Sequence, residues 1–385
     1  MGTRNEPLIL SVAIAGSGHH PGAAARSPQA LDVAHFRRLV QTAERGLLDF
    51  VFLHDERALP DAAVTGRLDA LSVLARLAPE TTYVGLAVSV PTTYSEPFNV
   101  SRALATLDFV SGGRAAWNAT SSGADAEAHN FGKTYAPDAD ERRSLAEEFI
   151  EVSRKLWDSW EDDAVITDRE RGLYLAPEKL HHINHFGAHF QIRGPQITYR
   201  PPQGHPVIVQ VDGGDPGTPL SATLADVLIL HHDTIEDAQR AYAEYKAQAI
   251  AARRELRILQ SILPILAETE MLARAKAATW DAAIPPGASA QPHARRFVGT
   301  PTQLADLSEQ WFEAHATDGF HLLPAVLPDG LEELTLNLVP ELQRRRLFRR
   351  AYTGRTLREH LHLPRPASQY AVPPTPIRNT VRRTI

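Results

Sequence analysis

Short apolar runs alternate with amphipathic stretches along most of this chain. Eight of the runs have the length of β-strands and are rich in β-branched residues, whereas the stretches between them carry helical periodicity. The predicted strands are Leu8–Ala15, Asp49–Leu53, Tyr83–Ser89, Arg114–Ala119, Pro206–Val211, Asp226–Leu230, Ile258–Leu266 and Gly319–Leu323. The predicted helices are Ala34–Arg45, Ala70–Leu77, Val100–Val110, Asp140–Trp157, Thr234–Ala252 and Thr302–Ala316.

Helix start and stop signals support these boundaries. Gly46 follows the first predicted helix, and Gly112-Gly113 follows the third. Thr300-Pro301 precedes the last predicted helix with an N-cap residue and a proline suited to the first turn.

Strands that alternate with helices predict a parallel sheet covered by helices, and eight strands close a (β/α)₈ barrel. A doubly wound sheet is the main alternative, but Ala15–His20 only loosely resembles a phosphate-binding turn. We therefore expect a single TIM-barrel domain over residues 1–385. Insertions are expected after the fourth strand (about 161–205) and the seventh (about 267–298), with a C-terminal arm at about 345–385.

Composition excludes several classes of function. The chain is 43% hydrophobic and 22% charged, which is typical of a globular protein, and its net charge of −6 does not favour nucleic acid or anionic membranes. It contains no cysteine, so disulfides and thiolate chemistry are excluded. No apolar run reaches membrane-spanning length, and the apolar N-terminal run reads as a first strand, so we expect a cytoplasmic protein.

Polar residues gather where the predicted strands end, which is where the active sites of barrel enzymes lie. The histidine pair His19-His20 either caps a turn or faces a substrate, and His54-Asp55-Glu56 directly follows a buried strand. His231-His232 suggests a metal, but adjacent residues of an extended segment point opposite ways, and we expect no metal site. No nucleophile elbow or phosphate loop is present, so the pattern favours a pocket that holds a cofactor.

A series of motifs runs through the chain in a recognisable order. They are Gly18-His-His20, Ala43–Gly46, Phe50–Leu53, Thr92–Pro97, Leu107–Arg114, Trp117-Asn118, Asn130–Gly132, Leu156–Trp160, Phe190–Pro195, Pro202–Gly204, Pro206–Gln210, Asp329–Leu331 and Pro340–Arg344. Over roughly residues 8 to 366 the chain resembles the bacterial luciferase-like flavin monooxygenases, in particular the nitrilotriacetate monooxygenase, pristinamycin synthase and dibenzothiophene-sulfone monooxygenase group.

The resemblance implies a two-component enzyme that takes reduced FMN (FMNH₂) from a separate NAD(P)H:flavin reductase. Such enzymes form a flavin C4a-(hydro)peroxide with O₂ and oxidise a small organic substrate. By position, Asp55, Ser89 and Asn118 would orient the flavin ring, while His20 and His321 would face the substrate. The resemblance also implies a homodimer or homotetramer, in which the arm beyond Leu347 would embrace a neighbouring protomer.

Two departures from the family pattern concern the phosphate of the cofactor. Ala139–Arg143 lacks the usual histidine and tyrosine, and the segment from Gln210 to Gly214 lacks the usual serines. In one interpretation Arg143 and the amides of Gly213 and Gly214 rebuild the phosphate site. In the other, Asp212 and Asp215 repel the phosphate, FMN binding is lost, and the protein is a flavin-independent enzyme or a ligand-binding subunit.

Overall fold

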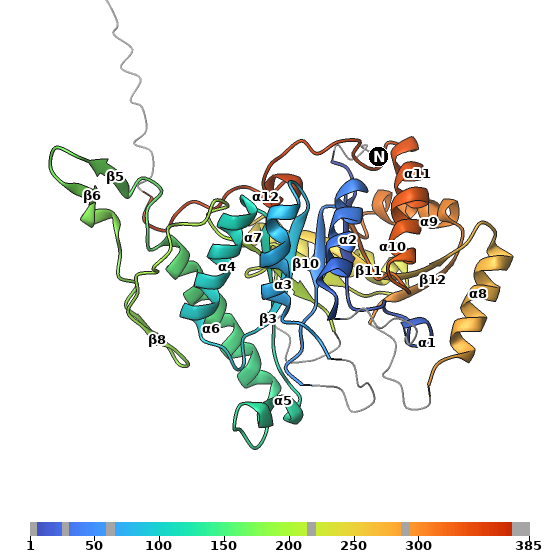
Figure 1. Ribbon diagram of the computed structural model, residues 1–385, viewed down its shortest axis with the longest axis horizontal. Helices are drawn as coiled ribbons and strands as arrows, with labels where there is room; N and C mark the ends of the chain where they lie inside the picture. Colours follow the sequence, from blue (N-terminus) through green and yellow to red (C-terminus); the bar gives the residue numbers. More distant parts are fainter. Residues whose placement is uncertain (1–5, 25–30, 59–65, 214–220, 286–292, 372–385) are drawn as a thin grey trace, which may run out of the picture.

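Eight parallel strands form a closed barrel at the centre of the structure (Figure 1). The computed structural model describes residues 6–24, 31–58, 66–213, 221–285 and 293–371. The barrel strands are β1 (Ile9–Ala13), β2 (Phe50–Leu53), β3 (Gly85–Pro91), β4 (Ala115–Thr120), β9 (Val207–Val211), β10 (Val227–Leu230), β11 (Arg257–Leu266) and β13 (Gly319–Leu322). Pairing of β13 with β1 closes the barrel, which confirms the predicted TIM-barrel fold.

Helices cover the outside of the barrel (Figure 1). They are α1 (Pro21–Ala24), α2 (Val33–Arg45), α3 (Ala70–Leu77), α4 (Pro97–Ser111), α5 (Asp125–Asn130), α6 (Ala139–Asp158), α7 (Ile235–Ala251), α8 (Glu270–Ala282), α9 (Pro301–Glu313), α10 (Asp329–Glu333), α11 (Val339–Arg344) and α12 (Leu357–His360). Short turns η2 (Ala78–Glu80), η3 (Pro177–Lys179) and η4 (Leu334–Leu338) complete the helical elements.

The predicted helix boundaries have the expected caps. Gly112 ends α4 in the left-handed conformation (φ 68°), where a residue with a Cβ would be strained. Thr300 begins α9 with a reciprocal capping box to Gln303, and Pro301 occupies the first turn.

Alternate residues of each strand face the two sides of the barrel wall. Phe50 and Phe52 lie in the inner apolar cluster, whereas Val51 and Leu53 pack in the layer between strands and helices. In β4, Trp117 faces the helices and donates from Nε1 to the carbonyl of Val90, 3.0 Å away. The next residue, Asn118, therefore points into the barrel.

The insertion predicted after the seventh strand contains regular structure. Helix α8 follows β11 directly, and a ninth parallel strand, β12 (Arg295–Gly299), pairs with the far end of β11. The sequence pattern missed this strand because Arg295 and Arg296 interrupt its apolar run. The strand also shows no alternation of buried and exposed residues that would reveal a period of two.

The insertion after β4 forms two small hairpins beside the barrel. Strands β5 (Val165–Asp168) and β6 (Leu173–Leu175) make the first, which projects from the left side of Figure 1. Strands β7 (His185–Phe186) and β8 (Gln191–Ile192) make the second.

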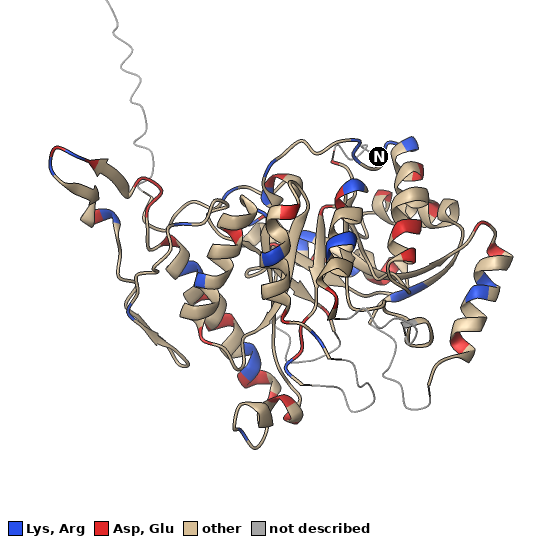
Figure 2. Cartoon of the chain, in the orientation of Figure 1, with Lys and Arg blue, Asp and Glu red and all other residues tan. Residues whose placement is uncertain are grey.

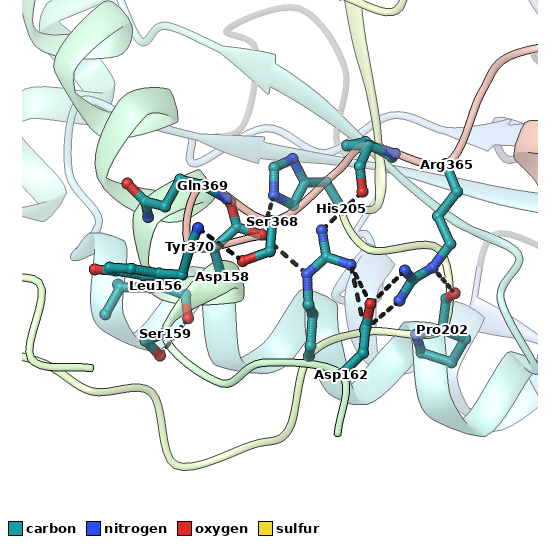
Figure 3. A network of polar contacts seen from close by, with 12 residues as sticks. Leu156, Asp158, Ser159, Asp162, Pro202, His205, Arg365, Ser368, Gln369 and Tyr370 are labelled. Carbon is teal, nitrogen blue, oxygen red and sulfur yellow. Dashed lines mark hydrogen bonds and ion pairs between the residues drawn. The ribbon is translucent and has the colours of Figure 1, made fainter. Parts of the chain in front are cut away.

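Ion pairs fasten this insertion to the C-terminal arm (Figure 3). Asp158 accepts hydrogen bonds from His205 Nε2 at 2.9 Å and from Arg200 Nε at 3.0 Å. Asp162 binds Arg365 through two oxygens, at 2.6 and 2.8 Å, and also contacts Arg200. The described part of the arm thus packs on its own barrel, and its contact with a neighbouring protomer stays a prediction.

Helix α12 of the arm plugs the end of the barrel at which the strands begin. Leu357, Leu361 and Leu363 join the inner apolar cluster, and Gly85 leaves room for them because a Cβ there would lie 2.6 Å from Leu357 Cδ1. Figure 1 shows α12 at one end of the barrel and α5 at the other. Within the described part of the chain, access to the barrel interior is therefore from the end at which the strands finish.

Charges of both signs are interspersed over the outer helices (Figure 2). Within the described ranges, no helix combines the length and the apolar character needed to cross a bilayer.

Candidate active site

A cavity of about 260 Å³ opens at the C-terminal ends of β2, β3, β4 and β9. We refer to it as the mouth cavity. Its lining residues are Phe52, His54, Asp55, Glu56, Pro91, Asn118, Ala119, Thr120, Ser121, Ser122, Glu127, Val211 and Gly213. Neighbouring parallel strands therefore deliver polar side chains to one place, as expected for this fold.

A chain of polar contacts runs along the wall of the mouth cavity. Asn118 Nδ2 donates to Ser89 Oγ at 2.9 Å, and Ser89 Oγ lies 3.3 Å from His54 Nδ1. His54 Nε2 lies 3.5 Å from the carboxylate of Glu56. The carboxylate favours a hydrogen on Nε2, which leaves Nδ1 to accept from the Ser89 hydroxyl.

Because the hydrogen bonds run in this direction, one buried acceptor is left without a donor. Because Ser89 gives its hydrogen to His54, it must accept from Asn118, and the amide nitrogen is the group that faces it. Asn118 Oδ1 is consequently buried without a partner in the described chain, as is Ser122 Oγ nearby. A buried acceptor without a donor costs about 1–3 kcal/mol, so both atoms indicate a binding role.

Asp55 lies at the end of β2, only 8% exposed. It accepts from the backbone N–H of Glu56 at 3.0 Å, and Arg57 lies 4.0 Å away. Burial raises the pKa of Asp55, although Arg57 opposes that effect.

His321 lies inside the barrel beside the mouth cavity. Its Nδ1 is 2.8 Å from Ser11 Oγ, and its ring meets Phe52, a lining residue, edge-on at 5.2 Å. Burial lowers the pKa of His321 to about 3, and the nearby His19 adds to the effect. The imidazole is therefore neutral at physiological pH and supplies a hydrogen bond rather than a charge.

His20 has a different environment from the one expected. Its Nε2 lies 3.2 Å from Asp281 of α8, its Nδ1 accepts from the backbone N–H of Gly22, and its ring contacts Trp280. Both nitrogens are occupied and the ring does not line the mouth cavity. His20 is thus held by α8 and is not among the lining residues of the mouth cavity, and its role towards a substrate stays a prediction.

Arg143 also lies apart from the lining of the mouth cavity, on α6, where it pairs with Asp140 at 3.0 Å. Its neighbour Arg142 is buried, and its guanidinium lies against Gly123 in the loop after β4. Arg142 is likewise not among the lining residues, but successive residues of a helix point about 100° apart, and the register of α6 turns Arg142 towards Gly123 in that loop.

The segment after β9 is only partly described. Gly213 lines the mouth cavity, whereas Gly214 and Asp215 fall outside the described residues. The carboxylate of Asp212 lies 3.8 Å from His293 Nδ1, which also donates to the Asp212 carbonyl at 3.0 Å. Asp212 is thus turned towards His293.

The sequence analysis placed His54 at the strand ends but gave it no role, and it did not consider Arg142, which lies near the loop after β4. For His54 the signal was available, since it continues the inward series Phe50 and Phe52 at a spacing of two. Among the described residues, no cluster of three or more potential ligands is arranged to hold a metal ion.

A larger cavity, of about 700 Å³, lies on the flank of the barrel between α6 and the second hairpin. Its ionic groups already bind one another, since Glu148 pairs with His185 and Asp158 with His205. It lies away from the strand ends. The mouth cavity, with its unpartnered acceptors, is therefore the candidate active site.

A barrel closed at one end, with a cavity lined by polar groups at the other, has the architecture of TIM-barrel enzymes. The family model for luciferase-like monooxygenases matches residues 11–332. N-acetyl-S-(2-succino)cysteine monooxygenase of Bacillus subtilis (strain 168) is 35% identical over 441 residues, covering 96% of this chain and 100% of that protein. Nitrilotriacetate monooxygenase component A of Aminobacter aminovorans is 35% identical, covering 96% of this chain and 99% of that protein.

A solved structure agrees with these relatives. EDTA monooxygenase from Chelativorans sp. BNC1 superimposes with a TM-score of 0.83 at 27% identity, covering 94% of this chain and 99% of that one. This chain belongs to the luciferase-like monooxygenase family and is a flavin-dependent oxidoreductase. The word "component" in the name of the nitrilotriacetate relative indicates a two-component system with a partner protein.

Proposed function

We propose that this chain is the oxygenase component of a two-component monooxygenase that oxidises a small organic substrate with FMNH₂ and O₂. The observation that carries the proposal is Asn118 Oδ1, a buried acceptor without a donor among the described residues of the mouth cavity. A flavin ring carries an imide N–H that satisfies such an acceptor, so Asn118 Oδ1 fits the cofactor ring. A separate NAD(P)H:flavin reductase would supply the reduced flavin.

Bound flavin would supply the electrons and activate O₂, while the chain's own residues position the reactants. Asn118 would accept from the ring, Ser89 and His54 hold the Asn118 amide in orientation, and Asp55 lines the same cavity. His321 offers a neutral imidazole on the substrate side. The apolar residues Phe52, Pro91 and Val211 exclude water from the same wall.

Fewer groups are available to bind the phosphate of FMN than to bind its ring. The backbone of Gly213 at the mouth cavity offers a donor, and the sequence suggests the same for Gly214. Arg142, whose guanidinium lies against Gly123, supplies a positive charge beside the loop after β4, in place of Arg143. The carboxylate of Asp212 lies near His293. This placement supports the interpretation in which the site can still bind the FMN phosphate.

We also expect a homodimer or homotetramer. The two hairpins of the insertion carry large exposed side chains, including Tyr174 (54% exposed) and Phe186 (80% exposed). Such apolar surface on a projecting element supports contact between protomers. Sedimentation velocity would report a species of twice or four times the chain mass, and a monomer at micromolar concentration would contradict the expectation.

Flavin titration tests the proposed function. Calorimetry or flavin fluorescence should show saturable binding of FMN, and of FMNH₂ under anaerobic conditions. Asn118→Ala should weaken binding at least about tenfold, since it removes the hydrogen bond that the site holds ready. Asn99→Ala, an exposed position on α4, is the matched control and should bind flavin normally. No saturable binding of either flavin form would favour the flavin-independent alternative.

A further inference from the structure

The side-chain amide of Asn118 is held at one of its two ends. Its Nδ2 donates to Ser89 Oγ at 2.9 Å, whereas its Oδ1 has no partner in the described chain. An amide group turns over by rotation about the last bond of its side chain, which exchanges the positions of oxygen and nitrogen. The contact with Ser89 therefore decides, within the described chain, whether Asn118 presents an acceptor or a donor to the mouth cavity.

Ser89 does not fix this orientation by itself. Its hydroxyl belongs to a side chain that is 1% exposed, and it lies between Asn118 Nδ2 and His54 Nδ1, which is 3.3 Å away. A hydroxyl has one hydrogen, so it donates to one of these neighbours and accepts from the other. His54 Nδ1 sets the direction, because it accepts when it lacks a hydrogen and donates when it carries one.

The structure shows the arrangement that belongs to neutral His54. Its Nε2 faces the Glu56 carboxylate at 3.5 Å and carries the hydrogen, so Nδ1 accepts from Ser89. Ser89 then accepts from Asn118 Nδ2. The oxygen of Asn118 is the end that remains for a ligand of the cavity.

A second proton on His54 reverses this series of hydrogen bonds. A protonated Nδ1 only donates, so Ser89 accepts from it and has to give its own hydrogen to Asn118. Asn118 takes that hydrogen through Oδ1, and its Nδ2 then turns to the cavity. Oδ1 gives up no other partner in the described chain when it turns. Without the turn, the buried Ser89 hydroxyl would have a hydrogen and no acceptor, which is unfavourable.

His54 exchanges protons with solvent and lies among groups that act on its charge. Its side chain is 44% exposed. The hydrogen bond with His54 lowers the pKa of Glu56, so this carboxylate is ionised at neutral pH and favours a proton on His54, while Arg67 binds Glu56 at 3.1 Å and weakens that effect. From the loop after β1, His19 also acts on His54, but burial lowers the pKa of His19 to about 4, so it is neutral at neutral pH. The remaining carboxylates of the cavity lining are those of Asp55 and Glu127.

We propose that the proton on His54 controls, through Ser89, which end of the Asn118 amide faces the flavin. The inference rests on the proposed function and makes His54 a positioning residue that acts through two others. Neutral His54 presents an acceptor to the imide N–H of the flavin ring, whereas protonated His54 presents a donor against that N–H. Acidification therefore weakens flavin binding while the chain stays folded.

Riboflavin is the probe that isolates this effect, because it has the flavin ring but no phosphate that titrates in the same range. Histidine side chains exchange a proton between about pH 5 and pH 8. Calorimetry on the full chain should show an affinity for riboflavin that falls at least about fivefold from about pH 8 to about pH 5.5. Circular dichroism at both ends of the range confirms that the chain is folded.

Two histidine variants locate the effect. His54→Asn introduces a side chain that gains no proton in this range, so the affinity for riboflavin should no longer change with pH. His182→Asn is the matched control. It removes an exposed histidine of the insertion, whose Nδ1 donates to the Gly194 carbonyl at 2.7 Å, and it should keep the full fall in affinity.

A second measurement needs no flavin. In the ligand-free chain, the NMR signals of the Asn118 side-chain amide, identified by their loss in Asn118→Ala, should shift over the same pH range as those of the His54 ring. Ser89→Ala removes the hydroxyl that links the two side chains. In this variant the Asn118 signals should no longer follow His54.

The outcomes separate this inference from the proposed function. A riboflavin affinity that does not change with pH, or a fall that persists in His54→Asn, overturns the inference while flavin binding itself stands. If no flavin binds but the Asn118 signals follow His54, the coupling stands and the oxygenase proposal fails. Asn118 signals that stay fixed while His54 gains its proton overturn the inference, whether or not flavin binds.

Discussion

The two ends of the barrel place their buried polar groups in different settings. At the base, where the strands begin, Arg358 of α12 donates to Asp226 at 2.8 Å and to the His205 carbonyl at 2.9 Å, and its backbone N–H donates to Gln203. At the mouth, Asn118 Oδ1 and Ser122 Oγ have no partner in the described chain. Arg254 Nε, Arg349 Nε and His360 Nδ1 at the base also lack partners among the described residues, but the unpartnered atoms of Asn118 and Ser122 belong to residues that line a cavity.

Electrostatics reinforce the contrast. Burial acts to raise the pKa of Asp226, but Arg358, Arg254 and Arg154 outweigh it and hold that pKa below its usual value. This buried charge at the base thus has counter-charges. Glu127 at the mouth has none in the described chain. Unsatisfied groups reduce stability, so those that line a cavity, as Asn118 and Ser122 do at the mouth, point to a binding role.

Removing a partner at the base should have the largest effect on stability. Arg358→Met leaves Asp226 buried with fewer counter-charges, and the free energy of unfolding should fall by about 3–5 kcal/mol. Urea denaturation measures it. Arg365→Met, which breaks the half-exposed pair with Asp162, is the control and should cost about 1 kcal/mol or less. Similar losses for both variants would remove the distinction between a buried and a surface pair.

Acid should reveal the neutral histidine at the mouth. His321 has a pKa of about 3 in the folded chain and 6.5 in the unfolded chain, so between these values only the unfolded chain takes up the proton. Above pH 6.5 the free energy of unfolding is not reduced by the titration of His321. As the pH falls, that free energy decreases, by on the order of 3 kcal/mol at pH 4. The difference between wild type and His321→Gln across this range isolates the effect. Parallel curves for the two proteins would contradict it.

One serine at each end of the barrel allows the two ends to be compared directly, with the smallest expected change in stability. Ser111 at the base donates to the Asp108 carbonyl and accepts from the Arg114 N–H, so Ser111→Ala should cost about 1–2 kcal/mol. Ser122 Oγ at the mouth has no partner in the described chain, so Ser122→Ala should change stability by less than about 0.5 kcal/mol or increase it slightly. Chemical denaturation of both variants measures the difference. A larger loss for Ser122→Ala than for Ser111→Ala would reverse the comparison.

Local patterns predicted the elements that bury apolar faces. The strand at Phe50–Leu53 and the helix at Ala70–Leu77 were identified within a residue of their observed bounds because alternation and helical periodicity depend on neighbours in sequence. Strand β12 was missed because its pairing with β11, and not an apolar pattern of its own, makes it a strand.

The predicted site residues also fall into two groups, those that line the mouth cavity and those that do not. Asp55, Asn118 and Gly213 follow strands directly or lie near their ends, so strand order and parity brought them to the mouth cavity. His20 and Arg143 lie outside its lining, because the packing of α8 over the loop after β1 and the rotation of α6 are set by distant contacts.

The order of the eight barrel strands, the inward position of Asn118 and membership in the luciferase-like family follow from the sequence alone, because each depends on local periodicity or on motifs read in order. Tertiary structure decided the rest. It closed the base with α12, placed the buried Arg142 against Gly123, and left the oxygen of Asn118 without a partner in the described part of the chain. These properties depend on which distant groups meet in three dimensions, and hydrogen bonding and charge pairing act only over such contact distances.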